Sequence, residues 1–294
     1  MKILFISDFL LEHTPGGAQR SNSLIIDAGE LRGHEIHQMH YQSNVSTLKL
    51  IQLLNNKKYD YVISSNLEEL AKEEGLIDLL HMLPNHVRLE HDMCMYLTEE
   101  NRHKLFSNCA KTFFLTEYHH KQFCNFYGDY FNNVEIVADP IDTSVFYDYG
   151  DEREDVILYV GFMHTFKGTN NFINFAKQNQ DKKFIVSAWG SDWFINQMLE
   201  LKNVDFIGKT EYEDMPKLYN KVNSIFYQPV MHEPFCRSVG EAILCGVPEL
   251  ITNDIIGCIH ERDRLGVKDF KNSCNNAAEI FWTTIEQFHY GKIK

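Results

Sequence analysis

Short hydrophobic runs alternate with longer amphipathic segments along the first half of the chain. The short runs are rich in β-branched and aromatic residues, and the longer segments repeat apolar residues every three to four positions. Helices are therefore predicted within 18–33 and 66–83. The predicted strands lie at 2–6, 34–40, 59–64, 87–91, 112–116 and 134–138. Strands that alternate with helices are typical of βαβ units and a parallel sheet.

The alternation stops at 139–155, an acidic segment without periodicity that we interpret as an interdomain linker. Beyond it the pattern restarts, with strands predicted at 156–161, 183–190, 204–208 and 224–229 and helices at 169–180 and 214–222. A chain of 294 residues is also long for one hydrophobic core. We therefore expect an α/β fold with two Rossmann-like parallel-sheet domains facing a cleft, where the carboxyl ends of the strands can bind ligands.

Charge and cysteine usage exclude several classes of protein. The formal net charge of −13 argues against sequence-independent binding of nucleic acid and against a polybasic membrane anchor. The seven cysteines are odd in number and include no C-x-x-C pair. The sequence therefore predicts neither a disulfide framework nor a zinc site. We therefore expect a cytoplasmic protein without a signal peptide, and no apolar run approaches the ~20 residues of a membrane span.

Two glycine-containing loops could bind an anion. HTPGGAQRSN (13–22) follows the first predicted strand, and its paired glycines allow a ligand to approach backbone N–H groups at a helix start. In VGFMHTFKGTNNF (160–172), Lys167 precedes Gly168 at another predicted helix entrance, where its ammonium could meet a phosphate. An ordinary surface loop and a solvated lysine remain the alternative interpretations.

Histidines occur at two places that could carry chemistry. His91 and Asp92 follow a predicted strand, so His91 could donate a hydrogen bond near a reacting centre or could serve a structural role. His34, His37 and His40 suggest a metal site only weakly, because a spacing of three along a strand places neighbours on opposite faces.

The stretch HEPFCRSVGEAILCGVP (232–248) has the most specific pattern. With Pro234 in the first turn, a helix would run to Cys245 and place Glu233 and Glu241 about 12 Å apart along its axis. The helix N-terminus between the two carboxylates favours a diphosphate, and Arg237 adds a fork of donors.

A purely structural interpretation of the same stretch stays open. Ser238 and Glu241 have the spacing of a capping box, in which both side chains only satisfy backbone N–H groups. Residue counting does not decide between the two interpretations.

Several motifs, in order, resemble those of the retaining GT-B glycosyltransferases of family 4. GGAQRSN, LRGHEIHQMHY, VRLEHDMCMY, VADPIDTSVFY and ILYVGFMHTFKG are similar to its first loop, second strand, histidine loop, linker and lysine loop. The segment 203–248 resembles its nucleotide-sugar half, including the Glu-x7-Glu motif. The resemblance spans about 240 residues.

The resemblance assigns roles residue by residue. It implies that Glu233 binds hydroxyls of the donor sugar, that Glu241 holds the ribose, and that His91 lies near the transferred sugar. Lys167 and Arg237 would lie at the donor phosphates, with Gly16 and Gly17 opposite them. The implied catalytic residues are Glu233, His91 and Lys167, and the implied donor-binding residues are Gly16, Gly17, Gly161, Lys167, Arg237, Ser238 and Glu241. No metal ligand is implied.

Three departures from the family pattern stand out. Phe162 occupies the position of the family's phosphate arginine, and Asp139 replaces the common linker asparagine. After CGVPELITNDIIG the usual Gly-Gly-x-x-Glu loop is not recognisable. We expect an N-terminal domain at 1–145, a nucleotide-sugar domain at 146–270 and, at 271–294, a terminal helix that crosses back to the first domain.

The expected activity is transfer of a hexosyl group from a nucleotide diphosphate sugar to an acceptor hydroxyl, with retention and without a metal or other cofactor. The acceptor could be a glycan, a lipid-linked molecule or a small molecule. The base could be selected by the loop at Lys209 and Thr210. A non-catalytic nucleotide- or glycan-binding module and a nucleotide-sugar epimerase or phosphorylase are the alternatives.

Overall fold

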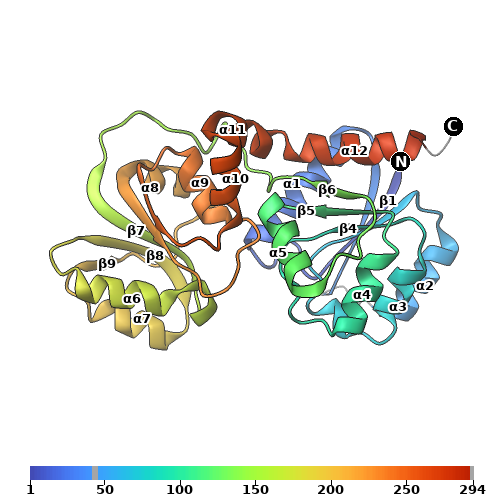
Figure 1. Ribbon diagram of the computed structural model, residues 1–294, viewed down its shortest axis with the longest axis horizontal. Coiled ribbons are helices and arrows are strands. Elements are labelled where there is room, and N and C mark those ends of the chain that lie inside the picture. The colour runs from blue at the N-terminus through green and yellow to red at the C-terminus, as the bar shows by residue number, and fades with distance from the viewer. Residues whose placement is uncertain (42–45, 292–294) are drawn as a thin grey trace. The chain divides into compact units, whose positions relative to one another are not determined.

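The computed structural model describes residues 1–41 and 46–291 and contains two compact units (Figure 1). The first comprises Met1–Pro140 and Ser273–Lys294, and the second comprises Ile141–Asn272. The chain passes between them at Pro140 and again within the helix at Val267–Asn275. No residue from 137 to 153 belongs to a helix or strand, which fits the linker expected at 139–155.

The first unit is built on a parallel sheet with the strand order β2-β1-β3-β4-β5-β6. Its strands are β1 (Lys2–Ser7), β2 (Glu35–His40), β3 (Tyr61–Ser64), β4 (His86–Leu89), β5 (Lys111–Phe114) and β6 (Val134–Ile136). Its helices are α1 (Gly17–Leu31), α2 (Thr47–Asn56), η2 (Leu70–Lys72), α3 (Leu76–Met82), α4 (Glu99–Ser107), α5 (Glu117–Tyr127) and α12 (Ala277–Gly291).

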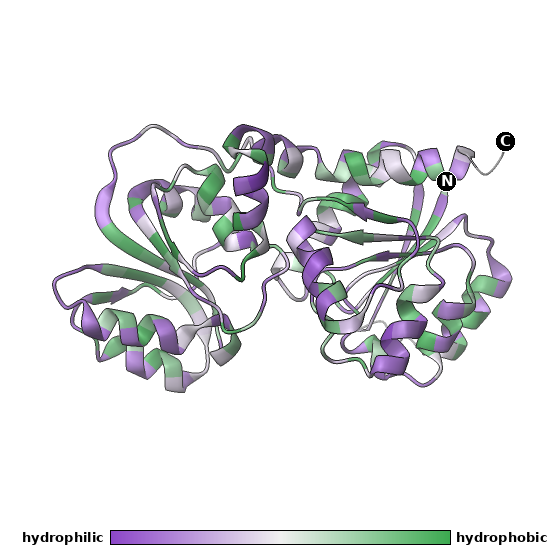
Figure 2. Ribbon diagram, in the orientation of Figure 1, coloured by the Kyte–Doolittle hydropathy of each residue, from purple (hydrophilic) through white to green (hydrophobic). Residues whose placement is uncertain are grey.

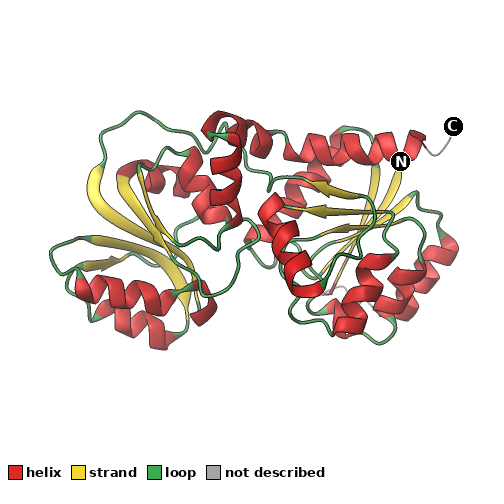
Figure 3. Ribbon diagram, viewed as in Figure 1, coloured by secondary structure: helices red, strands yellow, loops and turns green. Residues whose placement is uncertain are grey.

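Helices cover both faces of this sheet, as Figure 3 shows. Leu4 and Ile6 of β1 belong to one buried cluster with residues of α2, α3, α4 and α5. On the other face α12 packs along α1, and Trp282 of α12 donates from Nε1 to the carbonyl of Ile25 at 2.7 Å. Gly29 of α1 has no side chain where the Trp282 ring lies, so a Cβ there would overlap the ring. This close approach fixes the terminal helix on the first unit.

The second unit has a parallel sheet with the order β11-β10-β7-β8-β9. Its strands are β7 (Glu154–Met163), β8 (Phe184–Gly190), β9 (Val204–Phe206), β10 (Val222–Tyr227) and β11 (Glu249–Thr252). Its helices are η3 (Thr165–Lys167), α6 (Thr169–Gln178), α7 (Asp192–Leu199), η4 (Tyr212–Asp214), α8 (Met215–Lys221), α9 (Arg237–Leu244), α10 (Gly257–Leu265) and α11 (Val267–Asn275). Figure 2 shows that hydrophobic residues concentrate on the central strands of each unit.

The expected fold class is confirmed, and each predicted strand overlaps an observed one. The single helix predicted within 66–83 is wrong, because Gly75 adopts φ 76° and separates η2 from α3. The terminal helix at 277–291 packs on the first unit. Among the described residues, no helix is both long and apolar enough to span a membrane.

Candidate functional site

The connections of the second sheet diverge between β7 and β10. From β7 the chain proceeds outward to β8 and β9, whereas from β10 it proceeds to β11 on the opposite side. Open α/β sheets bind ligands beyond the carboxyl ends of strands at such a point, because the loops lead away from each other. The segments that follow β7 and β10 carry Lys167 and Glu233, respectively.

The segment that contains Glu233 is extended. The N–H of Glu233 donates to the carbonyl of Ile255 at 2.9 Å, and the N–H of Gly257 donates to the carbonyl of Glu233 at 2.8 Å. The N–H of Cys258 donates to the carbonyl of Phe235 at 2.9 Å. These backbone hydrogen bonds hold Glu233 beside the start of α10.

The helix predicted to start at Pro234 begins instead at Arg237. Cys236 precedes it in the left-handed conformation, with φ 72° and ψ 83°, and so separates the extended segment from α9. Glu233 therefore lies outside the helix, and the predicted separation of Glu233 and Glu241 along a single helix axis is wrong.

The capping-box interpretation is also wrong. Cys236 is the N-cap of α9, and no side chain caps this helix by a hydrogen bond. Ser238 lies inside the helix, where it cannot act as the N-cap residue. The carboxylate of Glu241 instead accepts hydrogen bonds from other side chains, Arg237 and Tyr219.

Glu233 accepts two side-chain hydrogen bonds on the same oxygen. Lys167 Nζ lies 2.7 Å from Oε1, and the hydroxyl of Tyr227 donates to the same atom at 3.0 Å. Burial and the charge of Glu233 hold the pKa of Tyr227 well above its ordinary value, so the phenol remains a donor. The side chain of Lys167 is 42% exposed and that of Glu233 is 13% exposed, so a ligand can reach the ammonium from solvent.

A second ion pair joins Arg237 to Glu241 within α9. Arg237 Nε donates to Glu241 Oε1 at 2.9 Å, and the two side chains are only 9% and 6% exposed. Tyr219 donates to the other carboxylate oxygen at 3.3 Å, and Arg237 donates from Nη2 to the Tyr212 hydroxyl at 3.0 Å. Burial and the Glu241 charge raise the pKa of Tyr219 well above its ordinary value. Glu241 is thus held in one orientation in the middle of α9.

The loop that carries Lys167 is tied to the segment after β10. Gly168 adopts φ 77°, and a Cβ there would overlap the carbonyl oxygen of Gln228. Asn171 donates from Nδ2 to the same carbonyl at 2.9 Å, and the N–H of Val230 donates to the carbonyl of Phe166 at 2.9 Å. The position of Lys167 therefore depends on Gly168.

An aromatic group takes the place of the family arginine. Phe162 is 48% exposed, and its ring lies 6.1 Å from that of His164 and 6.2 Å from that of Trp189. Lys209 Nζ lies 5.4 Å from the centre of the Trp189 ring. The neighbouring Thr210 is attached to β8 by a 2.6 Å hydrogen bond with the Ser187 hydroxyl. Gly161, with φ 118° and open space around its Cα, ends the buried part of β7.

Gly16 and Gly17 lie at the start of α1. Gly16 is the N-cap in an extended conformation and makes no side-chain capping bond, and Gly17 is the first helical residue. The backbone N–H groups at a helix N-terminus can bind an anion, so the site expected at Gly16 and Gly17 stays a prediction. The hydroxyl of Ser21 donates to Asp139, so the residue that replaces the linker asparagine is bonded to the same helix.

A fully buried carboxylate holds the backbone of the His91 loop. Glu90 Oε1 accepts from the N–H groups of His91 and Asp92, each at 3.0 Å. Its other oxygen accepts from Arg88 Nε and Nη2 at 2.9 and 2.7 Å and from Cys94 Sγ at 3.0 Å. Burial acts to raise the pKa of Glu90, but the Arg88 charge and the hydrogen bonds from Cys94 and the Asp92 N–H together lower it, so this Glu90 clamp is anionic.

Asp92 in this loop contacts His119 of α5. Burial and the Glu90 charge raise the pKa of Asp92 to about 7. Burial lowers the pKa of His119 to about 4, and Nε2 of this neutral imidazole lies 2.9 Å from the carbonyl of Asp92. The loop is thus fixed by buried groups.

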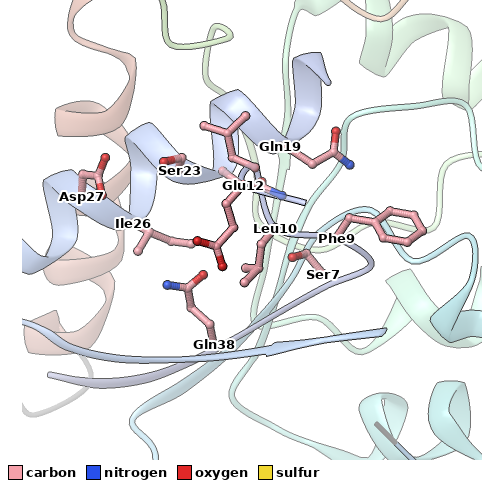
Figure 4. Close-up of a pocket in the computed structure, with 11 residues that line it drawn as sticks. Ser7, Phe9, Leu10, Glu12, Gln19, Ser23, Ile26, Asp27 and Gln38 are labelled. Carbon is pink, nitrogen blue, oxygen red and sulfur yellow. The ribbon is translucent and has the colours of Figure 1, made fainter. Parts of the chain in front are cut away.

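A pocket of about 340 Å³ opens in the first unit (Figure 4). Figure 4 shows Glu12 of the β1–α1 loop and Gln38 of β2 pointing into the same space. No Lys, Arg or His is among the described residues that line it, which are Ser7, Phe9, Leu10, Leu11, Glu12, Gln19, Asn22, Ser23, Ile26, Asp27 and Gln38. Amides, hydroxyls and carboxylates of this kind can bond the hydroxyl groups of an uncharged ligand.

The three histidines at 34–40 have separate partners. His34 lies 3.0 Å from Glu286 and packs on Trp282, whereas His37 lies 2.9 Å from Glu35. They form no metal cluster among the residues that the structure describes.

Comparison with known proteins finds a family match within the second unit. Residues 149–261 match the family described as "Glycosyl transferases group 1". The match covers most of the second unit. The resemblance seen in the sequence is thereby confirmed for this part of the chain. In a sequence comparison, no curated protein matches the chain.

Solved structures share the architecture of the whole chain. Sucrose-phosphate synthase of Thermosynechococcus elongatus aligns with a TM-score of 0.72 at 14% identity, covering 96% of this chain and 90% of that one. Anabaena HepE aligns with a TM-score of 0.64 at 15% identity, covering 100% and 98%. WaaG, a glycosyltransferase of lipopolysaccharide biosynthesis, aligns with 0.63 at 16%, covering 95% and 90%. The expected GT-B fold is confirmed.

Within the second unit, the structure brings together four residues predicted from the sequence as two pairs. These are Lys167 with Glu233 and Arg237 with Glu241. The sequence analysis missed the three tyrosines that hold the carboxylates and the arginine, which are Tyr212, Tyr219 and Tyr227. Tyr219 and Tyr227 lie in apolar patterns, where they look like ordinary core residues, and the sequence carries no signal of their hydroxyl partners.

Proposed function

We propose that this chain transfers a glycosyl group from a nucleoside diphosphate sugar to an acceptor hydroxyl, with retention of anomeric configuration. The second unit binds the donor, which is a co-substrate, and no other cofactor takes part. The observation that carries the proposal is the pair Lys167–Glu233 at the point where the second sheet diverges, beside the buried pair Arg237–Glu241.

In this proposal Lys167 binds the donor diphosphate. The Lys167 side chain is partly exposed, and Glu233 holds its positively charged ammonium in place. The ammonium can therefore stabilise the negative charge that develops on the leaving diphosphate. Glu233 then accepts hydrogen bonds from hydroxyls of the sugar, while Tyr227 keeps its carboxylate in place.

Glu241 binds the ribose hydroxyls of the nucleotide. Arg237 and Tyr219 each contact one oxygen of its carboxylate and so orient it. Arg237 is mostly buried, so it acts on the donor chiefly by orienting Glu241 and by adding positive charge at the start of α9, where Ser238 also lies. The backbone at Gly161 allows the sugar or phosphate to approach closely.

The first unit supplies the acceptor side of the reaction. His91, held by the Glu90 clamp, contacts the transferred sugar, and Gly16 and Gly17 offer N–H groups to the phosphates. The pocket lined by Glu12, Gln38 and their neighbours contains no cation among its described residues, which favours an acceptor that carries hydroxyls and no negative charge.

Known structures support the nucleotide part of this assignment. Structures of Anabaena HepE contain UDP with glucose, or UDP-glucose. Retention and the hexosyl donor follow from the family resemblance of the Glu-x7-Glu motif, here Glu233 and Glu241.

The test is a thermal-shift panel of UDP, GDP, ADP and CMP on the full-length chain, followed by turnover of the corresponding nucleotide sugars. A ligand that binds only the folded state stabilises it by about 2.7 kcal/mol at 100-fold excess over Kd. We expect one diphosphate to raise Tm and its sugar to release nucleotide in the presence of an acceptor.

The competing function is a non-catalytic nucleotide-binding module, which the aromatic Phe162 in place of the family arginine favours. Such a module would show the thermal shift but no nucleotide release with any donor sugar. No thermal shift with any nucleotide would contradict both functions.

A further inference from the structure

A histidine, a cysteine and an aspartate converge at the end of α5 in the first unit. His120 and Cys124 are one turn apart on the helix, and Nε2 lies 3.3 Å from Sγ. The Asp129 carboxylate lies with them, and the three ligand atoms are all within 4.8 Å of one another. Gly128, with φ 90°, ends the helix and donates its N–H to the Cys124 carbonyl at 2.8 Å, which turns the chain toward Asp129.

The spacing of these atoms suits a tetrahedral zinc site. Zinc–sulfur bonds of about 2.3 Å and zinc–nitrogen bonds of about 2.0 Å at a tetrahedral angle separate the two ligand atoms by roughly 3.5 Å. The observed 3.3 Å between His120 Nε2 and Cys124 Sγ is close to this value. A carboxylate is the third ligand type that zinc accepts, and water can complete the four.

Aromatic side chains hold the His120 ring in place. The ring is held against Phe114 and Phe131, at 5.0 and 5.9 Å between centroids. A cysteine binds zinc as its thiolate, so Cys124 would release its thiol proton when the ion binds.

Cys124 differs from the other cysteines of the chain, all of which are buried: Cys94, Cys109, Cys236, Cys245, Cys258 and Cys274. Only Cys124 is partly exposed, so among the seven it alone can be reached by a cation from solvent. The second cluster of possible ligands, Glu90 with Asp92 and Cys94, is already neutralised by Arg88 and is not a comparable site.

We propose that His120, Cys124 and Asp129 bind one zinc ion, or another thiophilic divalent cation, in the first unit. One thiolate and one carboxylate balance the two positive charges, and the thiol proton passes to solvent. The ion ties the last turns of α5 to the loop before β6. It is separate from Lys167, Glu233, Arg237 and Glu241, which all lie in the second unit.

The test starts from full-length chain stripped of metal with a chelator and titrated with Zn²⁺ against a chromogenic competitor. We expect one zinc per chain, and a loss of affinity on the order of 100-fold in Cys124→Ser and in His120→Gln. The matched control is His260→Gln, which removes an exposed histidine from the second unit and should bind zinc as the parent chain does.

Two further readouts can be recorded on the parent chain itself. Co²⁺ should give a sulfur-to-cobalt charge-transfer band in the parent chain that Cys124→Ser lacks. In the native parent chain one thiol should react readily with a thiol reagent, and Zn²⁺ should slow that reaction. A stoichiometry below one, zinc affinity unchanged in folded Cys124→Ser, or no charge-transfer band with Co²⁺ would each overturn the proposal.

Discussion

The ammonium of Lys167 lies 2.7 Å from the carboxylate of Glu233, although 66 residues separate them in the chain. Lys167 follows β7 and Glu233 follows β10, and these neighbouring strands are the ones between which the sheet diverges. In the proposed donor complex, the lysine faces the leaving diphosphate and the glutamate faces the sugar. The two residues therefore should contribute to different steps.

Removal of the lysine charge should weaken nucleotide binding. We expect Lys167→Met to raise the Kd of the preferred nucleoside diphosphate by about 10- to 100-fold, since a charge-assisted contact to phosphate contributes about 1.5–3 kcal/mol. Titration calorimetry measures the change. The control Lys217→Met removes an exposed lysine paired with Asp214 and should leave the Kd unchanged. Equal Kd values for both variants would remove Lys167 from the donor site.

The Arg237–Glu241 pair should contribute to stability as well as to binding. The Glu241 side chain is only 6% exposed, and Arg237→Met removes the guanidinium that neutralises its carboxylate. The variant should therefore lose about 3 kcal/mol of unfolding free energy, measured by urea titration. The double variant Arg237→Met/Glu241→Leu removes the unpaired charge and should recover much of that loss. It should not recover nucleotide affinity. If it did, Glu241 would have no role in binding.

Gly168 should tolerate no side chain. Gly168→Ala combines a left-handed backbone at φ 77° with an overlap on the Gln228 carbonyl, so it should destabilise the second unit by more than about 2 kcal/mol and weaken nucleotide binding. Gly208→Ala is the matched control, because Gly208 has φ 74° but open space around it. That variant should lose only about 1 kcal/mol. Similar losses in the two variants would show that the Gln228 contact is unimportant.

Asp92 should make stability depend on pH. An aspartate titrates near 3.9 in an unfolded chain, whereas burial and Glu90 raise the pKa of Asp92 to about 7 in the folded protein. Between about pH 4 and pH 7 the folded state keeps a proton that the unfolded state has lost, so the contribution of Asp92 to stability falls as the pH rises. Above about pH 7 the folded state also releases this proton, and the stability contributed by protonated Asp92 is fully lost.

The variant Asp92→Asn removes that titration and keeps an oxygen for the Cys94 N–H. Its unfolding free energy relative to the parent chain should rise between pH 5 and pH 7 by on the order of 1 kcal/mol per pH unit. Urea titrations of both chains at pH 5, 6, 7 and 8 measure the difference. A difference that stays constant with pH would mean that Asp92 titrates normally.

The sequence predicted the sheets well because buried parallel strands are continuous apolar runs, as in KILFI and VILYVG. It did not predict the break before α9. A proline and a helical pattern suggest a helix from Pro234, but Cys236 adopts φ 72° because Glu233 and Phe235 pair with the chain near Ile255 and Cys258. The residues around Cys236 give no sign in the sequence of this backbone pairing with a distant segment.

The sequence predicted the charged residues of the candidate site but not the tyrosines that hydrogen-bond to them. Lys167, Glu233, Arg237 and Glu241 belong to short motifs that residue spacing can identify. Tyr219 lies 22 positions before Glu241 and Tyr227 lies 6 before Glu233, so their hydrogen bonds depend on how helices and strands pack. For the same reason the exposed aromatic neighbours of Phe162 could not be foreseen.

The central claim is most directly tested by nucleotide release from the sugar of whichever nucleoside diphosphate stabilises the chain, with the parent chain, Glu233→Gln and Glu249→Gln compared side by side. Glu249 also accepts a hydroxyl hydrogen bond in the second unit, at 2.6 Å from Ser224, and serves as the control. The account predicts release by the parent chain and by Glu249→Gln, and a loss of about 100-fold or more in Glu233→Gln with nearly unchanged nucleotide affinity. No release by the parent chain despite nucleotide binding, or an unchanged rate in Glu233→Gln, would contradict it.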